Sequence, residues 1–154
     1  MLNKILQFFD NNIAAVSDAN HEQSLQLATA ALFVEMIQQD GKVVAEEKRA
    51  VKTSLKQCFN LSELNTDELF NLAEAELNQS TDYYQFTQLI NKYFDQPSKL
   101  KIVENLWRIA YSDNHLDELE EHMVRKIAEL IHVPHRHFIQ TKLKAQKQLG
   151  TNGN

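Results

Sequence analysis

The sequence contains little cysteine, glycine or proline: of 154 residues, one is cysteine, three are glycine and two are proline. The single Cys58 excludes an intramolecular disulfide and fits a reducing compartment. So few glycines and prolines are unusual for a chain of many strands and turns, and they indicate long helices. No apolar run approaches the roughly 20 residues that span a bilayer, and the N-terminus lacks a signal-peptide pattern. We therefore expect a soluble, cytoplasmic protein without stable membrane insertion.

Basic residues are also missing from one long stretch. Residues 57–91 contain no lysine or arginine, although acidic residues accumulate there. Residues 133–154 have the opposite imbalance, with four of the 16 basic residues and no acid. The first 132 residues therefore contain 12 basic residues and all 21 acidic residues. An acidic body repels phosphate backbones, so we expect no nucleic-acid partner.

The apolar residues that are present recur at helical steps of three and four almost everywhere. A stripe of this kind places Cys58 on the same apolar helix face as Val51 and Leu55. The pattern therefore predicts that the Cys58 side chain lies in the core. Thr66 and Thr81 are candidate N-caps. The predicted helices cover residues 2–10, 22–39, 45–59, 67–79, 82–94, 97–112, 117–131 and 134 onward. The fold class is therefore all-α, a single compact bundle of seven to eight helices.

The domain organisation follows from the same pattern. We expect an N-terminal helix and link over residues 1–20, one helical domain over residues 21–149, and a disordered tail over residues 150–154. A chain of this length buries a sizeable core without disulfides or structural metals.

Sliding the sequence against itself by 73 residues shows an internal repeat. "QQDGKVVAEEK" (residues 38–48) then aligns with "YSDNHLDELEE" (residues 111–121). Gly41 and Asn114 both readily take the left-handed conformation that closes a helix. Apolar positions before the turn also coincide: Ala30, Phe33, Val34, Met36 and Ile37 fall on Val103, Leu106, Trp107, Ile109 and Ala110. The repeat unit is a helix, a tight turn and a second helix.

An EF-hand calcium loop has the same outline but a different ligand pattern. It needs oxygen ligands at positions 1, 3 and 5, glycine at 6 and glutamate at 12. Counted from Asp40, positions 5 and 12 are Val44 and Val51; counted from Asp113, only Asp117 at position 5 fits among the positions after the first. An ordinary EF-hand is excluded.

The acids of the two turns allow two interpretations. In the first, Asp117 is an N-cap and Glu120 completes a capping box, while carboxylates in a first helical turn interact favourably with the helix dipole. Val44 offers no side-chain oxygen at the equivalent position, yet Asp40 and Glu47 remain there. In the second, the acids form one cluster that binds a divalent metal ion, with candidate ligands Asp40, Glu46, Glu47, Asp113, Asp117 and Glu120.

These turn motifs, with the closing "VPHRHF", resemble the two repeats of TerB-like domains over about residues 25–144. The resemblance implies an all-α fold in which the two acidic turns lie close together, a link to tellurite resistance and stress response, and no established catalysis. It also implies weak binding of Ca²⁺ or Mg²⁺ by matching residues: Asp40 and Glu47 in the first turn, Asp113 and Glu120 in the second. Related domains occur in a membrane co-chaperone.

Three positions depart from the family pattern. Gln39 stands where alanine is usual, Asn114 stands where the second turn usually has glycine, and Val44 stands where a polar N-cap is usual. The second turn keeps Asp117 and is richer in oxygen. If only one turn binds a cation, we expect the second.

Other motifs give no enzyme class. His132, His135 and His137 flank or follow a helix break at Pro134, so we interpret them as surface or capping residues rather than zinc ligands. No Ser/His/Asp order, phosphate loop or paired cysteine motif is present.

Two kinds of binding protein remain. One is a non-catalytic, ion-responsive module; the alternative is a metal-independent protein–protein interaction scaffold, co-chaperone-like. In either case we expect a protein partner. The N-terminal "MLNKILQFF" is apolar enough for peripheral membrane contact but too short for a stable anchor.

Overall fold

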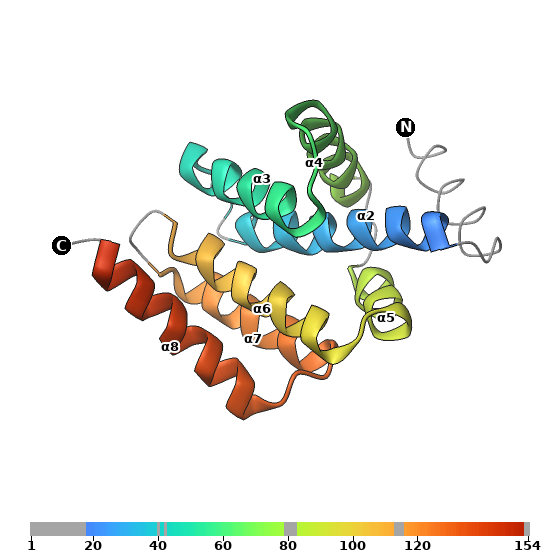
Figure 1. Ribbon diagram of the computed structural model, residues 1–154. Helices are drawn as coiled ribbons and strands as arrows, with labels where there is room; N and C mark the ends of the chain where they lie inside the picture. The colour runs from blue at the N-terminus through green and yellow to red at the C-terminus, as the bar shows by residue number, and fades with distance from the viewer. Residues whose placement is uncertain (1–17, 40, 42, 79–82, 113–115, 153–154) are drawn as a thin grey trace.

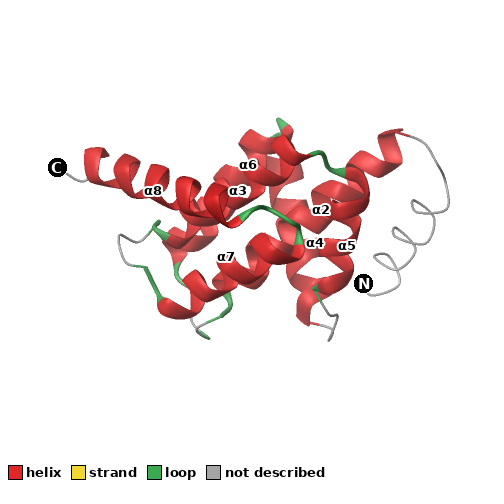
Figure 2. Cartoon of the chain, turned by 90° about the horizontal axis from the view of Figure 1, so that it is seen from below, coloured by secondary structure: helices red, strands yellow, loops and turns green. Residues whose placement is uncertain are grey.

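The protein is described from a computed structural model that places residues 18–39, 41, 43–78, 83–112 and 116–152. This part of the chain forms seven helices and no strand (Figures 1 and 2). The helices are α2 (Asp18–Ile37), α3 (Ala45–Phe59), α4 (Glu63–Asn78), α5 (Tyr84–Tyr93), α6 (Gln96–Ala110), α7 (Glu118–Leu130) and α8 (His135–Asn152). The predicted all-α bundle is confirmed, and the bounds of α3 coincide with the prediction.

Helix α2 is the central element of the bundle. It contacts α3, α4, α5, α6 and α7 and crosses the middle of the molecule in Figure 1. Its sequence explains this position, because from Leu27 onward apolar residues cover more than one face, and a helix that is apolar all round becomes buried. The residues buried there are Leu27, Ala28, Ala30, Ala31, Leu32, Phe33, Val34, Met36 and Ile37.

Helix α6 is the counterpart of α2 in the second repeat. It packs against α2, α3, α7 and α8. Trp107 is fully buried, with its ring centroid 5.1 Å from that of Phe138 on α8 and 6.1 Å from that of Tyr111. All five apolar residues of α2 that the repeat aligned with α6 are buried, and so are their five partners. The repeat is therefore a repeat of packing as well as of sequence.

Helix α4 begins four residues earlier than the sequence predicted. Ser62, not Thr66, supplies the cap: its Oγ accepts a hydrogen bond of 3.1 Å from the Asn65 N–H. Thr66 lies one turn inside the helix, where it is buried and its Oγ1 donates to the Ser62 carbonyl at 2.7 Å. Both residue types can cap a helix, and burial of Thr66 decides between them. The predicted cap Thr81 lies outside the described residues.

Three of the described helix ends are followed by a left-handed residue: Gly41 after α2, Asn60 with φ 53° after α3, and His132 after α7. Gly41 follows α2 with φ 75°, as predicted, and its N–H donates to the Gln38 carbonyl at 3.2 Å. His132 follows α7 with φ 62°, and the next N–H, of Val133, reaches back to the Ala128 carbonyl at 2.9 Å, which is the bond pattern of a Schellman motif.

Gly41→Ala tests the backbone requirement at the first turn. A Cβ at Gly41 would meet nothing within 4 Å, so any loss comes from the left-handed backbone alone. We expect the free energy of unfolding to fall by about 1–2 kcal/mol, measured by urea denaturation. Gly41→Asn is the matched control and should lose less, since asparagine tolerates this conformation better; an equal loss in both variants would contradict the explanation.

The structure describes the two ends of the chain to different extents. The predicted helix over residues 2–10 lies outside the described residues. Helix α8 continues to Asn152, into the segment that the sequence assigned to a disordered tail. Among the described helices, none has the length and apolar character needed to cross a membrane.

Candidate functional site

The two acidic turns lie at the same end of the bundle. The C-terminal ends of α2 and α6 and the first turns of α3 and α7 are all on the left in Figure 1. This follows from the repeat, because each unit enters its turn from a long buried helix and returns along a second one. Lying at one end of the bundle is a necessary condition for a site shared by both turns, but it does not by itself establish one.

Glu47 and Glu120 occupy equivalent positions in the first turns of α3 and α7, and both are buried. Their residues are 3% and 2% exposed, respectively. The Glu47 Oε1 accepts a hydrogen bond from the Val44 N–H at 3.3 Å, which satisfies one free donor of the helix start. The sequence aligned these two acids, but only the structure shows that both carboxylates are withdrawn from water.

Asp117 is the N-cap of α7, as the sequence predicted. Its Oδ1 accepts a hydrogen bond of 2.8 Å from the Leu119 N–H. Val44 has the same extended backbone at the start of α3, with φ −90° and ψ 158°, but no oxygen to offer. The asymmetry between the two turns that the sequence indicated is therefore present in the helix caps.

Asp117→Ala and Val44→Asp form a matched pair of predictions. Removing the Asp117 cap should lower the free energy of unfolding by about 1 kcal/mol, and adding an aspartate at the already extended Val44 should raise it by about 0.5–1 kcal/mol. Urea denaturation of both variants measures this. A loss in Val44→Asp as large as that in Asp117→Ala would contradict the equivalence of the two positions.

The remaining candidate ligands lie partly outside the described residues. Glu46 is exposed in the first turn of α3, while Asp40 and Asp113 are among the residues that the structure does not describe. Within the described ranges, no three His, Cys, Asp or Glu side chains gather closely enough to hold a metal ion. The structure thus brings four of the six acids to one end of the bundle as two pairs, Glu46 with Glu47 at the start of α3 and Asp117 with Glu120 at the start of α7.

Comparison with known families gives a match over most of the chain. A family model described as "Tellurite resistance protein TerB" matches residues 26–143. The chain belongs to the TerB family. No curated protein and no solved structure matches it. The match runs from α2 into α8 and includes all six acidic positions, so the duplicated turns lie within a tellurite-resistance-associated domain, over nearly the range that the resemblance predicted.

His132 and His135 of this TerB domain are surface residues at helix ends. His132 is exposed in the left-handed position after α7. His135 is exposed at the start of α8, and its ring stacks on Phe138 with centroids 5.7 Å apart. His115 lies outside the described residues. His132 thus closes a helix end, and His135 packs against an aromatic ring.

The TerB domain also contains a cavity that the sequence did not predict. It has a volume of about 650 Å³ and lies toward the N-terminal half of α2 and the C-terminal end of α3. Cys58 lines it and is exposed, so the prediction that Cys58 lies in the core is wrong. Partial burial raises the pKa of the Cys58 thiol, while the charges of Lys101 and Arg108 lower it to a smaller degree. A thiol with a raised pKa is a poor nucleophile at neutral pH.

Proposed function

We propose that this TerB domain is a non-catalytic binding module in which the acidic turns of both repeats hold one divalent cation. The observation that carries the proposal is the matched burial of Glu47 and Glu120 at equivalent positions. A carboxylate withdrawn from water is costly unless opposite charge or several hydrogen bonds compensate it. A cation held between the starts of α3 and α7 would supply opposite charge to both carboxylates at once.

The chemistry of the acids favours Ca²⁺ or Mg²⁺. Both ions are hard and take oxygen ligands, and carboxylates are their usual protein partners. Glu47 and Glu120 would supply one carboxylate each from α3 and α7. Asp40 and Asp113, which precede α3 and α7 in the sequence, would supply two more carboxylates. Glu46 and Asp117 would be additional ligands.

Cation binding would act through the angle between helix pairs. The cation would join the start of α3 to the start of α7, and so fix the α2/α3 pair relative to the α6/α7 pair. A partner that recognises this arrangement would then bind in a cation-dependent way. We propose that this coupling is what the module contributes to tellurite resistance and stress response.

Fluorescence of Trp107 tests the proposal. The side chain is fully buried on α6, stacked near Tyr111 at the end of that helix, and therefore reports on the second turn. We expect a saturable change on adding millimolar Ca²⁺ or Mg²⁺, lost in the variant Asp40→Asn with Asp113→Asn. Asp67→Asn with Glu68→Gln, on α4, is the control and should respond like the unmodified chain.

A metal-independent interaction scaffold is the second candidate. Three large apolar side chains favour it: Leu64, Leu119 and Leu143 are 68%, 52% and 58% exposed. Capture of a partner from native lysate that is unaffected by a chelator would support this function. A partner that is lost on chelation and restored by Ca²⁺ would support the cation-dependent module instead.

A further inference from the structure

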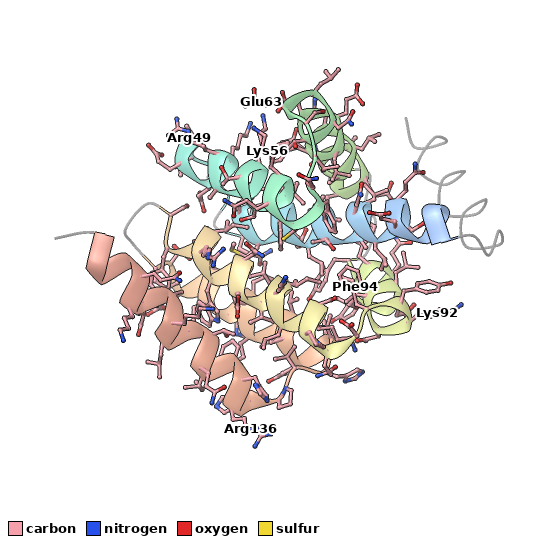
Figure 3. All side chains as sticks on the ribbon, viewed as in Figure 1. Arg49, Lys56, Glu63, Lys92, Phe94 and Arg136 are labelled. Atoms are coloured by element: carbon pink, nitrogen blue, oxygen red, sulfur yellow. The ribbon has the colours of Figure 1, made fainter. Side chains whose placement is uncertain are left out.

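The 650 Å³ cavity has an apolar wall and is large enough for a small organic molecule. It lies between α2, the last residues of α3, the end of α5 and one face of α6. Figure 3 shows Phe94 in the space bounded by α2, α5 and α6. The apolar lining of the cavity comes from five residues: Leu25, Phe59, Tyr93, Phe94 and Ile102.

The polar wall of the cavity is built on α6. Lys101, Asn105 and Arg108 follow one another at steps of four and three, so they share a face. Asn105 is buried, and its Nδ2 donates to the Cys58 Sγ at 3.1 Å and to the Lys101 carbonyl at 2.9 Å. Its position is thereby fixed between the two cations.

The charges on this wall are unequally compensated. Glu104 also lines the cavity, but its carboxylate is held by Lys144 of α8 at 3.5 Å. Among the described residues, no ion pair involves Lys101 or Arg108. Glu22 lies on a different wall, on α2. The surroundings of Cys58 are therefore positive, next to an apolar and aromatic surface.

We propose that this cavity binds a small amphipathic anion, with its anionic head between Lys101 and Arg108 and its hydrocarbon body against Phe59 and Phe94. The apolar wall excludes a simple inorganic anion as the preferred ligand, because it would leave that surface uncovered. The two cations select against an amphipathic cation of the same length. This site is separate from the acidic turns and does not rest on cation binding there.

Cys58 provides a reporter of occupancy that requires no added probe group. It is the only cysteine, it is exposed, and it lies beside both cations. A molecule bound in the proposed way would cover the thiol and slow its alkylation. Alkylation of the full chain by iodoacetamide, followed by intact mass, measures this rate.

The experiment uses decanoate, below its micelle concentration, as the anionic probe. We expect decanoate to slow alkylation saturably, and decyltrimethylammonium and acetate to have no comparable effect. Lys101→Gln and Arg108→Gln should each raise the half-protecting concentration of decanoate about fivefold. The alkylation rate of each variant with decanoate is compared with the rate of the same variant without decanoate, because the substitutions also change the reactivity of the Cys58 thiol. Arg136→Gln, an exposed cation on α8 (Figure 3), is the control and should leave protection unchanged.

Three results would overturn the proposal. The first is equal protection by decyltrimethylammonium, since the charges of Lys101 and Arg108 would then play no part in binding. The second is no protection at saturating decanoate. The third is unchanged protection in the double variant Lys101→Gln with Arg108→Gln. Saturable protection by decanoate that both substitutions weaken supports it.

Discussion

Phe33→Ala should lower the free energy of unfolding by about 3–5 kcal/mol, the largest loss expected from a single truncation in α2. Phe33 is fully buried in the C-terminal half of α2, the helix that contacts five others. Removing its ring leaves a cavity in the centre of the bundle, and the surrounding helices relax only partly into it. The loss should be seen in urea denaturation followed by both circular dichroism and Trp107 fluorescence.

Leu64→Ala is the control for this prediction. Leu64 has a similar apolar character but is 68% exposed at the start of α4, so its truncation should change stability by no more than about 0.5 kcal/mol. A loss below about 1 kcal/mol for Phe33→Ala would contradict the central position of α2. A second transition seen by only one of the two probes would show that the repeats unfold separately.

Calcium should raise the free energy of unfolding by about 2.7 kcal/mol at a hundredfold excess over its dissociation constant, if it binds only the folded chain. Glu47→Gln with Glu120→Gln should remove this gain. Glutamine keeps an oxygen that accepts the Val44 N–H, so the helix start stays intact while the charge is lost. Without calcium, the double variant should be at least as stable as the unmodified chain, because a buried neutral amide loses less hydration energy than a buried carboxylate.

Glu63→Gln with Glu68→Gln is the matched control for charge. These acids lie on α4, away from both turns, and their removal should leave the gain from calcium intact. The same gain in the Glu47/Glu120 variant as in this control would exclude the buried glutamates as ligands. A double variant much less stable without calcium would show that the two carboxylates act as structural groups.

The sequence predicted the helices well because their apolar periodicity is strong. It predicted the repeat for the same reason: Phe33 and Leu106, or Val34 and Trp107, are equivalent in sequence and equally buried. The start of α4 was missed because Ser62 and Thr66 are both capable caps, and local preference cannot show which of them the packing buries.

Cys58 was misplaced for a different physical reason. Its equivalent in the second repeat, Ile131, is fully buried. Helix α8 follows α7 and packs against both α6 and α7, whereas the last turn of α3 borders the cavity. The two repeats have the same periodicity but different neighbours, and a periodic pattern contains no information about what covers its final turn.

The acidic turns were predicted as a pattern, but their burial was not. Glu47 and Glu120 stand in polar runs with other acids beside them, and nothing in those runs distinguishes them from exposed Glu46. The register of the helices decides which glutamates are buried. Glu47 falls on the inward face of α3 with Val51 one turn later, and Glu120 falls on the inward face of α7 with Val124 one turn later. The cavity wall of Lys101 and Arg108 was missed because it combines α6 with the ends of α3 and α5, which only the fold brings together.

The stoichiometry of calcium binding tests the central claim most directly. Equilibrium dialysis of the full chain against Ca²⁺ should give one ion per chain, and Glu47→Gln or Glu120→Gln alone should weaken its binding by at least about tenfold. That result requires both turns to contribute to a single site. The claim of one shared site would be contradicted by two ions per chain, each lost in only one of the variants. It would also be contradicted by the absence of a bound ion at millimolar Ca²⁺.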